Sequence, residues 1–218
     1  YTKLLSDIEV KEGNNFVVKN EIEDKLNFED YRKKFNAVID FLKEGDCYQI
    51  NLSKQYKVQV EGDSWQFYKK FRNSNKSRYM AFLDFSDFEI ISGSPERFIQ
   101  VRNNEVNTRP IKGTTGRHKD PVVDQKNAQD LRESIKDQSE NLMIVDLLRN
   151  DLSQNCDVGS IKVSELFELE SYPNVHHLVS TVTGNLKKQS NMIQLFSDSF
   201  PGGSITGAPK IRAMEIIR

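Results

Sequence analysis

The chain has 218 residues, and its 31 lysines and arginines nearly balance its 32 aspartates and glutamates, which leaves a net charge of -1. This balance provides no global field to recruit nucleic acid or an anionic membrane, so neither is expected as a partner. No apolar run approaches the roughly 20 residues of a membrane helix, and Tyr1 to Leu4 show no signal-peptide pattern. Cys47 and Cys156 lack metal-ligand spacing, which favours reduced cysteines in a cytoplasmic protein.

The first predicted element is an amphipathic helix between Asn27 and Gly45. Its apolar residues recur at three and four positions, Asn27 can cap its start, and Gly45 can end it. The strand that follows, Tyr48 to Leu52, alternates apolar residues with polar amides. Gln49 can therefore line a pocket, or it can face solvent as an ordinary surface amide.

A short helix and several short strands are predicted next. The helix lies around Trp65, Tyr68 and Phe71. The strands are Tyr79 to Phe85, Glu89 to Ser92, Arg97 to Val101 and Glu105 to Arg109. Asn103 and Asn104 mark a tight hairpin turn. Consecutive short strands of this kind favour an antiparallel sheet.

From Val122 to Leu152 the pattern predicts one helix. The apolar residues spaced for a single buried face are Leu131, Ile135, Leu142, Val145, Leu148 and Leu152. Strands are predicted at Gly159 to Val163 and Val175 to Val182, a helix near Met192 to Phe196, and a glycine-rich turn from Pro201 to Lys210. Runs of strands separated by helices favour an α+β layered fold.

Lys112 is the first candidate for chemistry. It lies among glycine, hydroxyl and arginine side chains in the stretch Thr108 to Thr115, just after a predicted hairpin strand. This composition is compatible with a reactive site, although a lysine beside a glycine is also common in a solvated loop.

Two glutamates are further candidates. Glu96 follows Ser94 and Pro95 at the edge of a strand, where a carboxyl group shielded from water can act as a general acid. The alternative is an exposed glutamate paired with Arg97. Glu140 precedes an apolar helical run and can supply a hard oxygen ligand to a divalent cation, or it can be an ordinary residue of the helix surface.

The glycine-rich turn can bind an anion. Pro209 suits the first position of the helix that follows, which leaves the backbone N–H groups of Gly207 and Ala208 near the helix start. A plain turn is equally compatible with this pattern. A nucleotide-binding Walker loop is a poor match, because Gly207 is followed by Ala208 and Pro209 instead of lysine and a hydroxyl residue.

His176 and His177 are adjacent on a predicted strand. Their side chains must point to opposite faces, so at most one of them faces any given site. The other is expected to be a packing or surface residue.

Six motifs in order resemble those of the chorismate-binding enzyme family. They are Gly45 to Leu52, Ser94 to Phe98, Arg109 to Thr114, Glu140 to Leu147, Val175 to Ser180 and Pro201 to Lys210. The resemblance implies packed antiparallel sheets flanked by helices, with residues 1–218 forming part of a single catalytic domain. We expect the domain to be incomplete, because the chain begins with Tyr1 and ends at Arg218 within a helical pattern.

The resemblance also implies an activity, because Lys112 discriminates among the branches of the family. Members that make anthranilate or isochorismate carry alanine at this position. The branch that carries lysine aminates chorismate to 4-amino-4-deoxychorismate for para-aminobenzoate and folate biosynthesis, with ammonia from a glutaminase subunit. Anthranilate synthase chemistry and a catalytically silent chorismate-binding relative remain alternatives.

By resemblance, Lys112 attacks C2 of chorismate while Glu96 protonates the departing C4 hydroxyl. Ammonia then adds at C4 and expels the lysine. Isochorismate-type members use a lysine to activate water where this chain has Gln49, and an amide cannot act as that base.

The resemblance further implies Mg²⁺, with Glu140 as one ligand. A divalent ion fits because chorismate is a dianion. The residues expected to line the substrate site are Gly113, Thr114, His177, Ser204, Gly207 and Ala208. A second magnesium carboxylate and an arginine for a substrate carboxylate are expected beyond Arg218.

Overall fold

The computed structural model describes residues 15–218. The chain divides into two compact units, one of Tyr1–Phe28 with Lys54–Pro95 and one of Glu29–Ser53 with Glu96–Arg218. That residues 1–218 belong to one catalytic domain stays a prediction. Within the described part of the chain, no helix is long and apolar enough to cross a membrane.

The first unit contains one helix and an antiparallel hairpin. Its elements are β1 (Val17–Val18), β2 (Glu23–Asp24), β4 (Tyr56–Lys57), β5 (Val60–Glu61), α3 (Ser64–Asn75), β6 (Tyr79–Phe85) and β7 (Phe88–Ser94). The predicted short helix is confirmed, and Asp63 caps it by accepting a hydrogen bond from the Trp65 amide. The Trp65 and Tyr68 rings both pack against Phe82 of the hairpin. Aromatic burial therefore joins α3 to β6.

The second unit contains the larger sheet and most helices. Its elements are α2 (Phe28–Glu44), β3 (Gln49–Ile50), β8 (Arg97–Arg102), β9 (Glu105–Arg109), β10 (Ile111–Gly116), α4 (Pro121–Glu133), α5 (Ile135–Ser153), β11 (Lys162–Ser171), β12 (Val175–Asn185), α6 (Met192–Ser199), α7 (Gly203–Thr206), β13 (Gly207–Ala208) and α8 (Lys210–Ile217). Every strand pair is antiparallel, so the predicted α+β class with antiparallel sheets and flanking helices is confirmed.

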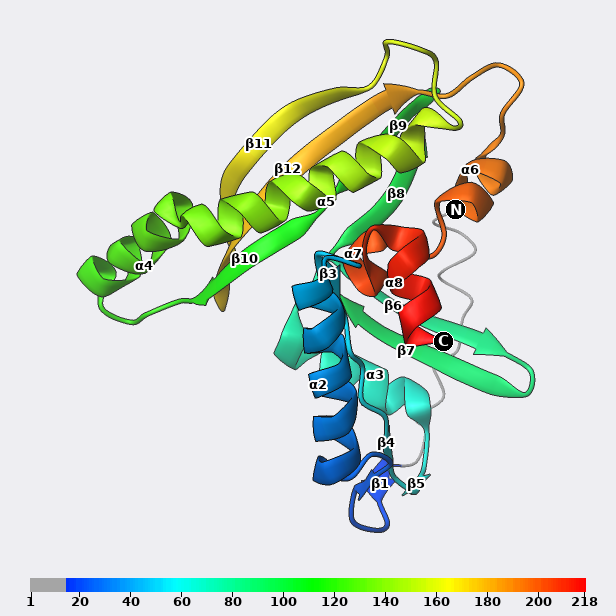
Figure 1. Ribbon diagram of the computed structural model, residues 1–218. Coiled ribbons are helices and arrows are strands. Elements are labelled where there is room, and N and C mark those ends of the chain that lie inside the picture. The colour runs from blue at the N-terminus through cyan, green and yellow to red at the C-terminus, as the bar shows by residue number, and fades with distance from the viewer. Residues whose placement is uncertain (1–14) are drawn as a thin grey trace, which may run out of the picture. The chain divides into compact units, whose positions relative to one another are not determined.

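Strand β12 is the centre of the five-stranded sheet (Figure 1). One edge of β12 pairs with β11, and the other pairs first with β10 and then with β9. Pro110 separates β9 from β10, and its carbonyl oxygen still accepts from the Ser180 amide of β12 at 3.2 Å. Asn103 and Asn104 both have positive φ, as the predicted tight turn between β8 and β9 requires.

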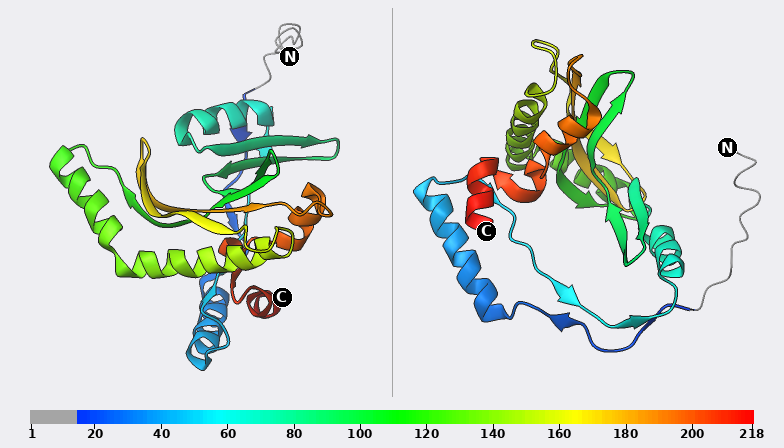
Figure 2. Two further views of the ribbon diagram at one scale, coloured as in Figure 1. Left: turned by 90° about the horizontal axis from the view of Figure 1, so that it is seen from above. Right: turned by 90° about the vertical axis from the view of Figure 1, so that its right-hand side faces the viewer.

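Helix α5 lies along one face of this sheet (Figures 1 and 2). The core between them is apolar and buried to at least 93%, and its residues are Val106, Val145, Leu152, Cys156, Val182, Leu186 and Leu195. Cys47 and Cys156 are both free and buried.

The prediction of one helix from Val122 to Leu152 was wrong. Ser134 takes an extended conformation and its hydroxyl caps α5, so α4 and α5 are separate helices that meet at an angle (Figure 2). Ile135 and Leu142 are 79% and 50% exposed, because they lie outside the buried face of α5. Asn141 is instead fully buried.

Strand β11 also differs from the prediction, since it covers Lys162–Ser171 instead of Gly159 to Val163. Two register irregularities interrupt its pairing with β12, and Phe167 has a φ of 57°. Bulges of this kind break the regular alternation by which a strand is recognised in sequence.

Asn141 joins α5 to β12. Its Nδ2 donates to the Leu178 carbonyl oxygen at 3.2 Å, and its Oδ1 accepts from the Ser180 hydroxyl at 2.6 Å. A buried amide with both functions satisfied fixes the position of one element along the other.

Replacing Asn141 with leucine is expected to lower the free energy of unfolding by about 2–4 kcal/mol, because it leaves the buried Ser180 hydroxyl without an acceptor and removes a hydrogen bond to the Leu178 carbonyl oxygen. Thermal or urea unfolding measures this change. Leu142→Asn is the matched control on the neighbouring, half-exposed position, and it is expected to change stability by less than about 0.5 kcal/mol. Equal losses in the two variants would contradict the assignment of the buried face.

Candidate active site

The Glu96 side chain is held by two segments distant in sequence. Glu96 lies directly before β8, and its Oε2 accepts a hydrogen bond from the Ile111 amide at 3.3 Å. Its Oε1 accepts from the Ser204 hydroxyl of α7 at 2.8 Å. The carboxyl group is therefore fixed beside β10, and it is partly buried instead of exposed.

The environment of Glu96 makes its carboxyl group a weaker acid than in water. Burial raises the pKa of the Glu96 carboxyl, while the Ser204 hydroxyl, the Ile111 amide and the positive charge of Lys112 oppose the shift. Desolvation is the largest of these effects, so the pKa stays above the ordinary value. A carboxylic acid of this kind is suited to donate a proton.

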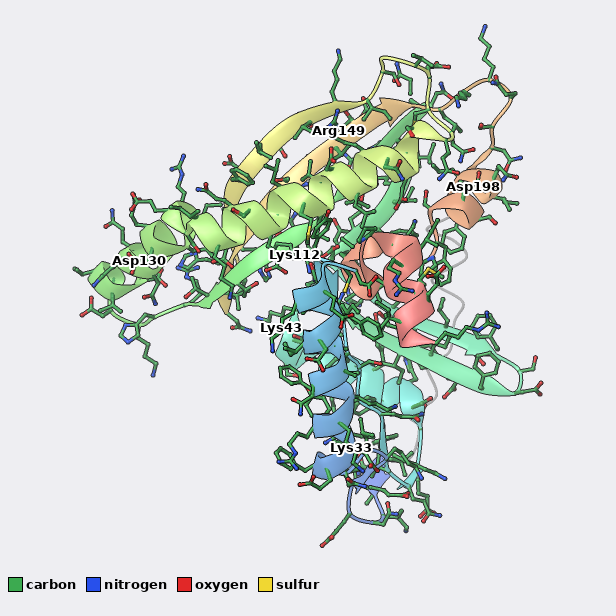
Figure 3. All side chains as sticks on the ribbon, in the orientation of Figure 1. Lys33, Lys43, Lys112, Asp130, Arg149 and Asp198 are labelled. Atoms are coloured by element: carbon green, nitrogen blue, oxygen red, sulfur yellow. The ribbon has the colours of Figure 1, made fainter. Side chains whose placement is uncertain are left out.

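Lys112 lies on β10 beside α5 (Figure 3). Its Nζ is 3.4 Å from Oε1 of Glu140, and the two side chains are 15% and 34% exposed. Lys112 also acts electrostatically on Glu96. The structure thus brings together three of the residues that the sequence singled out for chemistry, although their roles stay predictions.

Gly113 allows β10 to bend next to Lys112. The pairing of β10 with β12 shifts register between Ile111 and Thr114, and Gly113 has a φ of +91°. A Cβ atom on Gly113 would lie 2.9 Å from Cβ of Asp137 and 3.0 Å from Cδ1 of Leu131. Only glycine fits this close approach of strand to helix.

Thr114 and His177 form a pair on neighbouring strands, with 2.8 Å between the hydroxyl and Nδ1. Burial lowers the pKa of His177, so the neutral imidazole is favoured near pH 7. His176 instead contacts Ser171 and Asp124. The two histidines have separate surroundings, as predicted from their alternation, and the role of His177 in substrate binding stays a prediction.

The glycine-rich turn is a short helix and strand instead of a loop. A Cβ on Gly203 would lie 1.9 Å from Cδ2 of Leu147, which explains the glycine that packs α7 against α5. Gly207 has a φ of +145°, and a Cβ there would lie 2.1 Å from the Gln49 carbonyl oxygen. Both glycines therefore serve close packing.

The predicted anion site at Gly207 and Ala208 needs correction. The Gly207 amide donates to the Gly203 carbonyl oxygen, so it is not free. Gly207 and Ala208 form β13, which pairs with β3, and Pro209 is the N-cap of α8 instead of its first residue. Whether these residues line a substrate site stays a prediction.

An amide side chain directly after β3 contacts α7. Asn51, which the sequence did not single out, donates from Nδ2 to the Ser204 carbonyl oxygen at 2.9 Å. Gln49 donates to Asn51 at 3.4 Å, and Oε1 of Gln49 is buried without a hydrogen-bond partner among the described residues. Of its two predicted environments, an ordinary solvent-facing amide is excluded for Gln49.

Glu140 is the only metal-ligand candidate that the sequence supplied. Residues 15–218 contain no group of three or more histidine, cysteine, aspartate or glutamate side chains that could hold a metal. Mg²⁺ is often bound by one or two carboxylates together with substrate and water. The partly exposed oxygen of Glu140 fits such a shared site, and it does not form a complete one.

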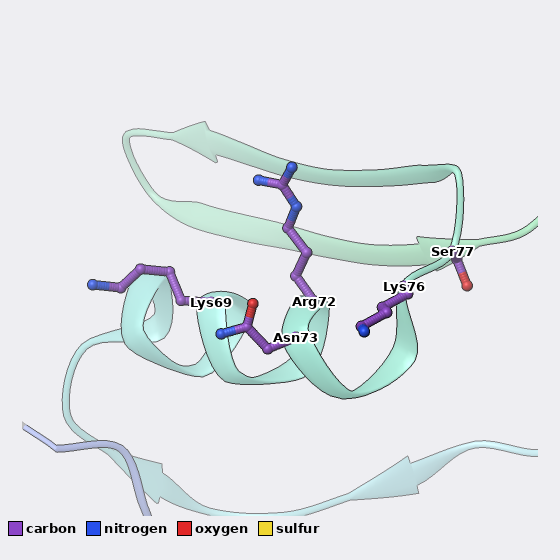
Figure 4. A pocket seen from close by; sticks show the side chains of 5 residues that line it. All are labelled: Lys69, Arg72, Asn73, Lys76 and Ser77. Carbon is purple, nitrogen blue, oxygen red and sulfur yellow. The ribbon is translucent and has the colours of Figure 1, made fainter. Parts of the chain in front are cut away.

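A hollow of about 490 Å³ lies in the first unit, against α3. Its cationic side chains are Lys69 and Arg72 of α3 and Lys76 directly after the helix, and they point in different directions (Figure 4). Because they do not converge on one point, this surface resembles a solvated helix face more than a site for one ligand.

Two curated relatives carry the same printed name. The chain is 52% identical over 188 residues to aminodeoxychorismate synthase component 1 of Salmonella typhimurium, covering 86% of this chain and 41% of that protein. It is 48% identical over 203 residues to aminodeoxychorismate synthase component 1 of Escherichia coli, covering 93% and 45%. The chain thus spans less than half the length of these relatives.

A solved structure agrees with the fold. The crystal structure of anthranilate synthase component I from Streptococcus pneumoniae matches with a TM-score of 0.85 at 30% identity, covering 99% of this chain and 48% of that one. The sequence model of a protein family described as chorismate binding enzyme matches residues 3–218. With the sequence motifs and the arrangement of Glu96, Lys112 and Glu140, this match establishes that the chain belongs to the chorismate-binding enzyme family.

Proposed function

We propose that the protein containing this chain aminates chorismate to 4-amino-4-deoxychorismate, the step that leads to para-aminobenzoate and folate. The two relatives named aminodeoxychorismate synthase component 1 are 52% and 48% identical, against 40% for anthranilate synthase component 1 of Saccharolobus solfataricus. The name "component 1" also supports a partner subunit, for which we propose a glutaminase that supplies ammonia. We further propose that the enzyme is cytoplasmic.

One observation carries the chemistry. The Glu96 carboxyl, whose pKa is raised by burial, is held by the amide of Ile111, the residue directly before Lys112. A buried carboxyl group with a raised pKa therefore lies close to an amine. This arrangement serves a reaction in which one group attacks the substrate and the other protonates the leaving group.

In the first step, the neutral amine of Lys112 forms a bond to C2 of chorismate. The ring double bond shifts, the C4–O bond breaks, and Glu96 gives its proton to the departing oxygen, which leaves as water. Lys112 must first release its proton to solvent, and Oε1 of Glu140, 3.4 Å from its Nζ, helps to hold the amine in place.

In the second step, ammonia bonds to C4, the double bond shifts back, and the C2–N bond to Lys112 breaks. The new ammonium group then returns a proton to the Glu96 carboxylate. The sum is chorismate and ammonia giving 4-amino-4-deoxychorismate and water, and both side chains return to their starting states.

We propose that Glu140 is one of the ligands of Mg²⁺, which when bound would neutralise a carboxylate of the dianionic substrate. We further propose that Thr114, His177 and Ser204, which carry hydrogen-bonding groups, line the substrate site. The neutral form of His177 suits a hydrogen bond to a hydroxyl or carboxylate better than a charge interaction.

The products test the function directly. The natural full-length protein, given chorismate, Mg²⁺ and ammonium without a glutaminase, is expected to form 4-amino-4-deoxychorismate and no pyruvate. Mass spectrometry distinguishes the outcomes. Anthranilate with pyruvate would replace the proposal by anthranilate synthase chemistry, and no turnover would favour a silent chorismate-binding relative.

Replacing Lys112 with alanine is expected to lower kcat by at least about 1,000-fold and to abolish covalent attachment of substrate, because the nucleophile is lost. Partial rescue by high concentrations of free ammonia is compatible with this role. The control is Lys119→Ala, at an exposed position of the turn before α4. Wild-type turnover in the Lys112 variant would exclude the covalent route.

Replacing Glu96 with glutamine is expected to lower kcat by about 100-fold or more, because the proton donor is lost. Glu96 has a raised pKa in the folded state, so the wild type loses stability as pH rises from the ordinary value of about 4.5 through the raised one. The Glu96→Gln variant has no ionisable group at this position, so it does not lose this stability. Its melting temperature relative to wild type should therefore increase over that pH range.

The matched control for Glu96 is Glu89→Gln, at an exposed position of β7. This variant should follow the wild type in both kcat and the pH dependence of melting. A Glu96 variant whose melting temperature fell progressively below that of the wild type with rising pH would show that the carboxylate, and not the acid, is the favoured form.

A further inference from the structure

One ammonium group connects the two ends of the segment that carries Ser204. Helix α6 ends at Ser199 and α8 begins at Lys210, and α7 and β13 lie between them. Nζ of Lys210 donates to the Ser199 carbonyl oxygen at 3.1 Å and to Oδ1 of Asp151 at 2.7 Å. Lys210 thus joins both ends of the segment to α5.

Asp151 depends on this contact. Its side chain is 1% exposed, that of Lys210 is 14% exposed, and Oδ2 of Asp151 has no hydrogen-bond partner among the described residues. The carboxylate is therefore compensated chiefly by Lys210. A buried charge that loses its single partner is strongly unfavourable, so the two residues keep each other in place.

Helix α5 connects this pair to the proposed catalytic groups. Glu140, which contacts Lys112, precedes Asp151 by 11 positions, or about three helical turns. Between them, Leu147 packs against Gly203 at the start of α7. One rigid helix therefore sets the position of Lys112 through Glu140 and the position of the Ser204 segment through Leu147 and Asp151.

We propose that Asp151 and Lys210 are a positioning pair, which holds the segment from Ser199 to Lys210 on α5 so that the Ser204 hydroxyl stays on the Glu96 carboxyl. Neither residue touches the substrate in this role. The inference deepens the proposed function, on which it rests for its catalytic consequence, while the placement of Ser204 is a property of the fold.

The consequence is a change in the acid strength of Glu96. Of the described groups around Glu96, Lys112 on β10 acts on it directly, Glu140 on α5 acts through Lys112, and α7 contributes the uncharged Ser204 hydroxyl. The Ser204 hydrogen bond lowers the pKa of Glu96. Loss of this hydrogen bond, with the burial of Glu96 unchanged, therefore raises that pKa further.

The test uses Asp151→Asn combined with Lys210→Met in the natural full-length protein, so that no buried charge is left unpaired. Infrared difference spectra between each protein and its Glu96→Gln version report the titration of Glu96 without any need for turnover. The double variant is expected to raise the pKa of Glu96 by about one unit, the effect of losing one hydrogen bond to a carboxylate.

Ser204→Ala alone should produce the same shift, and adding it to the double variant should produce no further one. The basic limb of the pH profile of kcat should move upward in parallel. The control is Asp146→Asn with Arg149→Met, an exposed ion pair on the same helix, which should leave the titration unchanged.

A double variant in which Glu96 titrates as in the wild type would overturn the inference, and lower thermal stability alone would then mark the pair as merely structural. If the double variant does not fold, Asp151→Asn alone keeps the side-chain shape and should produce a smaller shift in the same direction; no shift would again overturn it. A wild type without turnover would refute the proposed function and leave the infrared result to decide this inference.

Discussion

The packing of α5 against β12 is the constraint on which the rest of the second unit depends. Asn141 satisfies both its amide functions with β12, at Leu178 and Ser180, and it does so in a fully buried position. These two hydrogen bonds fix the position of α5 along β12 and hold the helix against the strand. Every functional contact made by α5 follows from that register, since Glu140 is adjacent to Asn141 and Asp151 lies on the same helix.

The proposed site is built from groups that contribute little to stability and much to chemistry. Glu96 is a buried carboxyl with a raised pKa, and Lys112 is an amine held near two glutamates. Burial of ionisable groups costs free energy unless neighbouring groups compensate them. The backbone amide of Ile111 and the hydroxyl of Ser204 supply such compensation for Glu96, and both come from segments that packing has already fixed.

Some features were predictable because their causes are local. Asn103 and Asn104 accept positive φ, so the hairpin between β8 and β9 was correctly placed. The break between α4 and α5 at Ser134 was not predicted, because the apolar pattern continues across it. The exposure of Ile135 and Leu142 shows that the buried face of α5 was assigned to the wrong residues. The amide of Gly207 was expected to be free, but the short turn of α7 engages it, which no spacing rule revealed.

The sequence by itself determined which groups are present and which family they resemble: an amine at Lys112, a carboxyl at Glu96, and glycines where backbones approach closely. Only the tertiary structure decided that Ser204 meets Glu96 across 108 positions and that Lys210 meets Asp151 across 59. Contacts of this kind depend on the path of the whole chain through the sheet and over α5. Propensity and spacing act over a few residues, and so they cannot specify which distant side chains share a buried environment.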